Sequence, residues 1–285
     1  MKQLFLDGSQ SFSKRNQPYL AYVSKVEAMD LSHPRILHSH KDIVEIILIT
    51  SGHDEIFIDA NQYPIKKGDL LIYNSGVVHD ELFQNEKNPI ALYCVGIKNI
   101  HEEQLPANSL IPESFSPIFA TKACFGLLMH LFSSIFLLVD DPFVHYEIAV
   151  QNILAALLEI IKTTILADTV SLPNRKNEES AILQSIKRYI DQHFSEPIQL
   201  QYLEENWHIS RYYLSHKFKE AYGYSTIDYL NRRRIGEAQT LLLNTKKTIT
   251  EISLAVGFNS AAYFNNVFKR NVSLTPKEYR KRYLK

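Results

Sequence analysis

The sequence predicts an α+β protein: an N-terminal β-barrel with flanking helices, followed by an all-α domain in which a long helix joins two helix-turn-helix motifs. Two observations predict this fold class. Short β-branched and aromatic runs separated by Gly, Asn and Pro fill much of the first third of the chain. Near the C-terminus one pattern of apolar residues occurs twice, in residues 200–224 and 249–274, which is typical of a duplicated unit. A chain of 285 residues with 45% hydrophobic composition can form two separate cores.

The strands of the barrel are predicted from short apolar runs with strong β-propensity. The four clearest runs are residues 43–50, 55–59, 70–74 and 90–97. Turn-forming residues separate them, which favours a small barrel of short strands.

Residues 117–167 are predicted to be helical and strongly apolar. One apolar stripe runs from Phe125 to Leu138 and a second from Ile148 to Ile161. A break between the two helices is expected where Pro142 follows two aspartates. Neither run is expected to reach the length of a membrane span.

A polar segment divides the chain into two domains. Residues 168–180 contain Pro173 and lack an apolar period, so they are predicted to be a linker. The N-terminal domain is therefore expected to comprise residues 1–167 and the C-terminal domain residues 181–285.

Each copy of the C-terminal repeat is predicted to form two short helices joined by a tight turn. In the second copy Thr248 and Glu251 have the spacing of a capping box. Between the copies a long helix is predicted to run from Ser225 or Thr226 to Asn244. Its buried stripe is expected to contain Ile227, Leu230, Ile235, Ala238, Leu241 and Leu242.

The formal net charge of zero conceals two oppositely charged halves. Residues 181–285 contain 17 Lys and Arg against 9 Asp and Glu, and the remaining residues contain 14 against 22. A basic domain attracts phosphate, so nucleic acid is the expected partner of the C-terminal half. Attraction between the two domains is a second explanation, and both can hold.

The C-terminal domain carries a specific family pattern. Its residues are Leu214, Phe218, Lys219, Gly223, Arg234, Ile235, Ala238, Val256, Gly257, Phe258, Tyr263, Phe264, Phe268, Lys269, Thr275, Pro276, Tyr279 and Arg280. On these residues the chain resembles transcription regulators of the AraC/XylS family. Ser273 departs from the pattern, which usually has Gly there, and this departure concerns the local turn. A helical-repeat module that binds protein is the alternative interpretation.

The resemblance implies that the second helix of each motif enters the major groove of DNA, with its reading face opposite the buried one. The predicted DNA-binding residues are Ser210, Tyr212, Ser215, His216 and Lys219 in the first motif and Ser260, Ala261, Ala262, Asn265, Asn266 and Lys269 in the second. Asn can bond adenine and Ala can contact a thymine methyl, which favours an A·T-containing half-site. From the family pattern, Arg234 is expected to form an ion pair that fixes the two motifs, whereas Arg232 and Arg233 are expected to face solvent or phosphate.

The N-terminal domain resembles the cupin fold, although Asn74 and Phe83 depart from its motifs. The matching residues are His38, His40, Glu45, Gly52, Gly68, Asp69, Gly76 and His79. In metal-binding cupins the positions of His38, His40, Glu45 and His79 supply the ligands, and this set suits Fe, Mn, Ni or Zn. Glu45 has the opposite strand parity to the first two histidines, so convergence requires a bend near Lys41 and Asp42.

An effector pocket without a metal or other cofactor is the other interpretation of the same residues. The predicted effector-binding residues are His38, His40, Glu45, His79, Glu81, Phe83 and Tyr93. Polar and aromatic side chains that point into a barrel suit a small polar molecule such as a sugar.

Together these features predict an effector-responsive transcription regulator, activator or repressor, that binds double-stranded promoter DNA and is not an enzyme. The alternative is a metal-dependent cupin dioxygenase or isomerase with a fused DNA-binding domain. The resemblance implies a homodimer formed through residues 117–167, unless these helices only complete the monomer core. An activator would also contact RNA polymerase. Because Cys94 and Cys124 lack metal spacing and no signal peptide is recognised, a cytoplasmic location without a membrane partner is expected.

Overall fold

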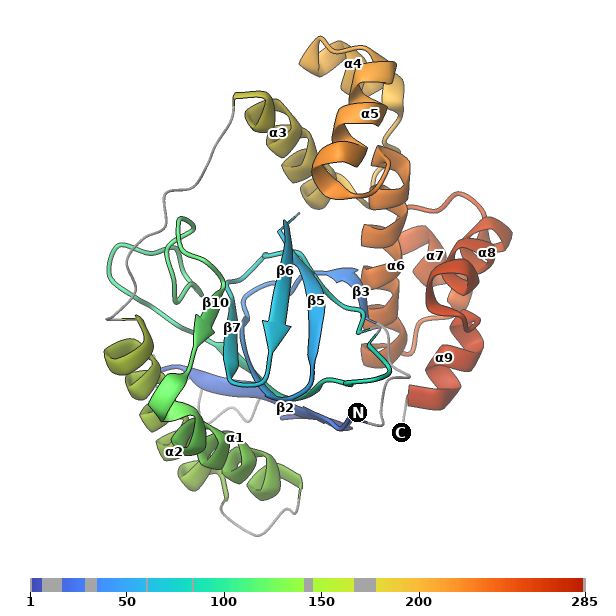
Figure 1. Ribbon diagram of the computed structural model, residues 1–285. Helices are drawn as coiled ribbons and strands as arrows, with labels where there is room; N and C mark the ends of the chain where they lie inside the picture. Colours follow the sequence, from blue (N-terminus) through green and yellow to red (C-terminus); the bar gives the residue numbers. More distant parts are fainter. Residues whose placement is uncertain are drawn as a thin grey trace.

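The computed structural model has a β-barrel domain and a helical domain that lie against each other (Figure 1). The structure describes residues 2–6, 17–28, 35–59, 61–83, 85–140, 146–166 and 178–283. Most of the predicted linker, residues 168–177, lies outside the described residues, and the helical domain begins at Glu178.

Two sheets form the barrel, which confirms the predicted fold class. The six-stranded sheet has the order β1 (Lys2–Phe5), β2 (Tyr19–Val26), β9 (Ala91–Lys98), β4 (Val44–Ser51), β7 (Asp69–Tyr73) and β10 (Ile118–Ala120). The four-stranded sheet has the order β3 (Arg35–His38), β8 (His79–Glu81), β5 (His53–Ile58) and β6 (Asn61–Lys66). All pairs of neighbouring strands with an assigned register are antiparallel.

Strand β4 contains the continuous apolar run 46–49 because both of its faces are buried there. Ile47 and Ile49 point into the barrel, and Ile46 and Leu48 pack against the helices outside it. Those helices are α1 (Phe125–Asp140) and α2 (Tyr146–Ile160), and a π-helical turn (Ile161–Leu166) follows α2. The predicted helical region therefore begins later than residue 117, since β10 precedes it.

The expectation that neither apolar segment reaches the length of a membrane span is wrong for the run Lys122–Asp140. Its 19 residues have a mean hydropathy of 1.9, which by length and composition alone is enough to cross a membrane. In the structure one face of α1, including Phe132 and Ile135, is buried against the six-stranded sheet. Leu127 and Leu137 stay exposed, so the high hydropathy comes from two apolar faces rather than one.

The helical domain contains both predicted helix-turn-helix motifs. Its helices are α3 (Glu178–His193), α4 (Leu200–Trp207), α5 (Arg211–Tyr222), α6 (Thr226–Asn244), α7 (Ile249–Ala255), α8 (Ala261–Val272) and α9 (Pro276–Tyr283). Helix α6 begins after the cap Ser225, as predicted. The capping box of Thr248 and Glu251 is present, and Thr275 exchanges the equivalent hydrogen bonds with Glu278.

Ser273 occupies the position where the family pattern has Gly, and it adopts the left-handed conformation with φ of 63°. The equivalent residue after α5 is Gly223, with φ of 72°. Both backbone N–H groups cap their helix by bonding the carbonyl four residues earlier, Lys269 and Lys219. The turn therefore keeps the family geometry with a residue that is less suited to it.

Helix α6 is buried on more than the predicted stripe because it packs lengthwise against strand β3 of the barrel (Figure 1). The Ile36 N–H donates to Gln239 Oε1 at 3.0 Å. Gly236 faces the same strand, and a Cβ there would lie 2.8 Å from the Ile36 carbonyl oxygen and closer still to that of Leu37. Ile227, predicted to be buried, is instead exposed because it lies near the N-terminal end of α6.

Arg233 is a second correction, since it is 1% exposed and does not face solvent or phosphate. Its guanidinium donates to the Leu37 carbonyl at 3.1 Å, to Ser39 Oγ at 3.3 Å and to Asp191 Oδ1 at 3.1 Å. Lys187 adds a further link, with Nζ 2.6 Å from Asp59 Oδ1 of the barrel. The two domains are thus joined by hydrogen bonds and an ion pair along the edge strand β3 and its neighbours.

Candidate DNA-reading helices and effector pocket

Helix α5 presents the predicted reading face of the first motif. The hydroxyl of Ser210 accepts from the Tyr213 N–H and starts the helix. Leu214 and Phe218 are fully buried. The predicted residues Tyr212, Ser215, His216 and Lys219 are all exposed on the opposite face. Tyr212 is 76% exposed and its ring meets the edge of His216 at 5.0 Å.

Helix α8 repeats this arrangement in the second motif. Ser260 accepts from the Tyr263 N–H, and Phe264, Val267 and Phe268 are buried. Of the predicted residues, Ala262, Asn266 and Lys269 are exposed, and Ala261 and Asn265 are half-buried. The Asn265 amide donates to the Ala261 carbonyl at 2.7 Å, whereas the Asn266 amide makes no hydrogen bond with any described residue. Asn266 is therefore the better placed of the two amides for a base edge.

Arg234 does not form the predicted ion pair; it links the loop between α3 and α4 to the second motif by other interactions. Its guanidinium donates to the Phe194 carbonyl at 2.7 Å and to the Glu196 carbonyl at 2.8 Å. The same group lies 5.5 Å from the ring centre of Phe258, which belongs to the second motif. Arg232 stacks on Tyr224 at 4.3 Å. A planar guanidinium suits these carbonyl and ring contacts, which sequence spacing alone does not reveal.

In the barrel, the four predicted ligand residues converge. One ligand atom from each of His38, His40, Glu45 and His79 lies within 4.8 Å of the others. The chain turns at Lys41 and Asp42, where Asp42 has φ of 60°, and this turn moves Glu45 to the other sheet. Because of this turn, Glu45 converges with the three histidines despite its opposite strand parity, and this is the bend that the sequence required.

Backbone carbonyls orient two of the imidazoles. His38 Nδ1 lies 3.0 Å from the Ile36 carbonyl oxygen, and His79 Nδ1 lies 3.1 Å from that of Val77. A carbonyl only accepts, so Nδ1 carries the proton and the Nε2 lone pair faces the centre of the cluster. Burial and the nearby Arg35 lower the pKa of His38 well below its usual range, which keeps that ring neutral.

Glu45 supplies the negative charge of the cluster. Its carboxylate accepts from the Tyr22 hydroxyl and lies 2.8 Å from His79 Nε2 and 3.5 Å from His40 Nε2. Burial opposes ionisation, but the neighbouring His40 and His79 outweigh it and hold the pKa of Glu45 below its usual range. Burial also lowers the pKa of His40 to about 4. At neutral pH the cluster thus holds an ionised Glu45 beside the neutral imidazoles of His38 and His40.

These residues fit a divalent metal ion. Nε2 of His38, His40 and His79 and Oε2 of Glu45 are buried without a hydrogen-bond partner in the described part of the molecule. A carboxylate oxygen and an imidazole lone pair 2.8 Å apart repel each other unless a proton or a cation lies between them. Metal bonds to such ligands are about 2.0–2.2 Å long, so ligands spread over 4.8 Å need only a small contraction.

The other three predicted pocket residues lie in different places. Glu81 is buried opposite Arg35 in the pairing of β3 with β8. Phe83 packs against the core inside the barrel. Tyr93 is wrongly predicted, because it lies on the outer face of β9, where its ring contacts Phe136 of α1. Strand alternation places the next residue, Cys94, inside, with Sγ 3.7 Å from Glu45.

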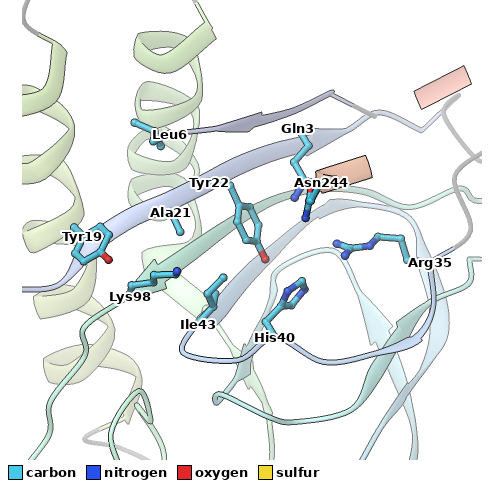
Figure 2. A pocket seen from close by; sticks show the side chains of 10 residues that line it. All are labelled: Gln3, Leu6, Tyr19, Ala21, Tyr22, Arg35, His40, Ile43, Lys98 and Asn244. Atoms are coloured by element: carbon cyan, nitrogen blue, oxygen red, sulfur yellow. The ribbon is translucent and has the colours of Figure 1, made fainter. Parts of the chain in front are cut away.

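A cavity of about 290 Å³ opens beside the cluster at the mouth of the barrel (Figure 2). Its lining residues are Gln3, Leu6, Tyr19, Ala21, Tyr22, Arg35, His40, Ile43, Lys98 and Asn244. Only His40 among them was predicted. Arg35, a charged residue next to the apolar pair Ile36 and Leu37, was the signal in the sequence for the rest. Asn244 is the last residue of α6, so the helical domain contributes to the wall of the cavity.

Known proteins resemble both halves of the chain. A model of the AraC-like ligand binding domain matches residues 20–171, more than half of the chain, and a helix-turn-helix domain model matches residues 203–282. The HTH-type transcriptional regulator YdiP of Escherichia coli is 22% identical over 86% of this chain and 81% of its own length. The bifunctional transcriptional activator/DNA repair enzyme AdaA of Bacillus subtilis is 33% identical, but the match spans only 38% of this chain and 51% of AdaA.

Two solved structures align with parts or most of the chain. The C-terminal domain of the response regulator AraT from Geobacillus stearothermophilus is 33% identical, with 38% of this chain and 91% of that one covered and a TM-score of 0.37. ToxT from Vibrio cholerae is 14% identical, with 94% and 97% covered and a TM-score of 0.45. On the two family models, the chain belongs to the AraC family of transcriptional regulators, with an AraC-like ligand-binding domain followed by a helix-turn-helix DNA-binding domain.

Proposed function

We propose that this protein is a dimeric, effector-responsive transcription regulator in which α5 and α8 read two adjacent segments of promoter DNA. The observation that carries the proposal is the pair of equivalent exposed polar faces on α5 and α8, described above. Arg234 and the shared helix α6 hold the two helices in one rigid unit. Two reading helices fixed in one chain suit successive major grooves, about 34 Å apart along the duplex.

The exposed side chains divide into base readers and phosphate contacts. Asn266 and Ala262 offer an amide and a methyl group, which suit adenine and thymine. Lys219 and Lys269 lie at the C-terminal ends of α5 and α8, where a cation can reach a flanking phosphate. This arrangement favours a half-site with an A·T-containing segment opposite α8.

The helices outside the barrel supply a surface for the second copy. Leu137 of α1 is 65% exposed and Ile148 of α2 is 69% exposed, and the two helices pack on each other. Leu127 and Met129 extend the exposed apolar surface on α1. Exposed large apolar side chains on neighbouring helices are what an association surface of a soluble protein requires.

Effector occupancy can reach the DNA-binding unit through β3. This strand carries His38, and its backbone is held by Arg233 and Gln239 of α6. A ligand that binds one arrangement of β3 and α6 more tightly than another would shift the population of DNA-binding states.

A metal-dependent role for the barrel is the second candidate, and the four converging ligand residues favour it. His38, His40, Glu45 and His79 would hold the ion, and a bound divalent ion would supply Lewis acidity at the cavity wall. Metal analysis of purified protein tests it: about one ion per chain is expected, with loss of the ion on His79→Ala. Protein that stays metal-free after incubation with Zn²⁺, Mn²⁺, Ni²⁺ and Fe²⁺ would exclude this candidate.

Selection of bound sequences from a random duplex pool tests the regulator. Full-length protein at a fixed salt concentration is expected to enrich a motif of two segments about one helical turn apart. Asn266→Ala should relax the preference in one segment only. Enrichment of no sequence at all, with binding that depends only on salt, would contradict the proposal.

A further inference from the structure

We propose that the effector is a small organic carboxylate, bound in the cavity of Figure 2 with its acid group between Arg35 and Lys98. This inference rests on the proposed effector-responsive function and names its ligand class. It departs from the sugar expected from the sequence. The charge of the cavity, the burial of Arg35 and the position of Asn244 carry it.

Arg35 is the central group. It is only 7% exposed, and its guanidinium extends toward His40 and Asn244 at the cavity wall (Figure 2). Glu81 and Glu45 raise the pKa of Arg35 against the effect of burial, although neither forms an ion pair with it in the described part of the molecule. Glu45 instead directs its oxygens to Tyr22, His40 and His79. No hydrogen bond links the guanidinium to a carboxylate in the described part of the molecule, so its N–H groups are free to bond an anion in the cavity.

Lys98 adds a second positive charge at the end of β9. It lines the same cavity and forms no ion pair with any residue that the structure describes. No Asp or Glu belongs to the described lining. The N-terminal domain is acidic overall, so this local concentration of positive charge is not a consequence of its composition. A cationic cavity in an acidic domain selects for anions by electrostatic focusing.

The rest of the cavity sets the size and polarity of the ligand. A volume of about 290 Å³ lies at the small end of ligand pockets, roughly 300–1,000 Å³. Leu6, Ala21 and Ile43 provide an apolar wall. The geometry therefore suits a compact carboxylate with an apolar body. A neutral sugar would place hydroxyl groups against this wall and would supply no anionic partner for the guanidinium inside the cavity.

Through Asn244, such a ligand would directly contact the domain that contains the DNA-reading helices. It ends α6, the helix that joins the two reading motifs, while the other lining residues belong to the barrel domain. A carboxylate in the cavity would thus contact both domains at once. Its binding free energy would favour the arrangement in which α6 stays against the barrel.

Calorimetric titration of full-length protein tests the proposal. The probes are benzoate and 4-phenylbutyrate, each compared with its neutral primary amide. We expect saturable binding of at least one carboxylate at one molecule per chain, and binding of its amide weaker by roughly tenfold or more, because a charge-assisted hydrogen bond is lost. Equal binding of acid and amide, or binding of neither acid, would overturn the proposal.

Two cavity variants and one control locate the site. Arg35→Gln and Lys98→Gln are each expected to weaken carboxylate binding about tenfold, and Lys66→Gln, an exposed lysine outside the cavity, should leave it unchanged. Lys98 is half-buried whereas Arg35 is buried, so the Lys98 variant keeps the test valid if Arg35→Gln fails to fold. Unchanged affinity in Lys98→Gln would place the ligand elsewhere and refute the assignment.

The outcome is separable from that of the proposed function. If the DNA selection yields a two-segment motif but no carboxylate binds, the regulator stands and the ligand class falls. If carboxylates bind as described and no DNA motif is enriched, the cavity stands and the regulator falls.

Discussion

Replacing Gly236 by Ala tests whether α6 and β3 hold the two domains together as the structure shows. A Cβ at this position would lie 2.8 Å from the Ile36 carbonyl oxygen and closer still to that of Leu37. Both obstacles are backbone atoms, so no rotamer change can relieve the clash. Overpacking of this kind costs about 1–3 kcal/mol. The gain in helix propensity from Gly to Ala, about 1 kcal/mol, offsets part of it.

The largest overpacking cost, about 3 kcal/mol, less the gain in helix propensity leaves about 2 kcal/mol. We therefore expect Gly236→Ala to destabilise the docked arrangement of the two domains by up to about 2 kcal/mol. Amide hydrogen exchange of β3 is the assay, because the Ile36 N–H donates to Gln239 of α6. A loss of 2 kcal/mol should accelerate its exchange roughly thirtyfold if exchange follows opening of the interface. Equilibrium unfolding in urea measures the accompanying loss of global stability.

Gly126→Ala is the matched control, since Gly126 also lies in a helix and nothing lies within 4 Å of the added Cβ. It should be neutral or stabilising by at most about 1 kcal/mol, with unchanged exchange in β3. If Gly236→Ala behaves like this control, α6 does not pack on β3 in solution and the proposed coupling through this strand is wrong.

Three further predictions follow from charges and exposure. Lys219→Ala should weaken DNA binding similarly for all sequences and reduce the slope of log affinity against log salt by about 1, and an unchanged slope would mean that Lys219 does not contact phosphate. Leu137→Glu should shift the protein toward monomer in analytical ultracentrifugation, while Leu254→Glu, on the exposed face of α7, should not; a dimer in both variants would locate the interface elsewhere. Burial raises the pKa of Asp80 to about 6, so its ionised form disfavours the folded state above that pH, and this contribution to stability improves as pH falls from about 7 to about 4. Asp80→Asn should therefore be more stable than the parent at pH 7.5 by up to about 3 kcal/mol and lose that advantage near pH 4, as measured by urea unfolding at each pH; a constant difference across the range would refute the assignment.

The barrel site shows where sequence patterns suffice and where they do not. The four ligand residues converge as predicted because motif spacing and a turn at Asp42 fix their positions. Tyr93 was assigned to the wrong face of β9, because both faces of that strand are buried and apolar content does not distinguish them. The cavity was missed because its lining comes from β1, β2, β9, the chain around β3 and the end of α6, which are distant in sequence.

Arg233 and Arg234 illustrate the same limit in the helical domain. Adjacent arginines in a basic run look alike in the sequence, but one faces β3 and the other the loop after α3. Ile227 was expected to be buried from its spacing, but it is 38% exposed, whereas Thr226 and Tyr229 beside it are buried. Periodicity identifies a face of a helix, and only packing decides which neighbours cover it.

The sequence by itself determined the α+β class, the duplicated helix-turn-helix motifs, their caps and the exposed reading faces. These features depend on interactions within a few residues or on one repeat that carries its own core. Only the tertiary structure decided that α6 packs on β3, that Arg233 is buried between the domains, and that a cationic cavity lies where both domains meet. Such features arise from contacts between segments up to about two hundred residues apart, as in the hydrogen bond from Ile36 to Gln239. A local sequence pattern does not specify which two surfaces pack together. Each surface could pack as stably on any other surface of complementary shape and charge.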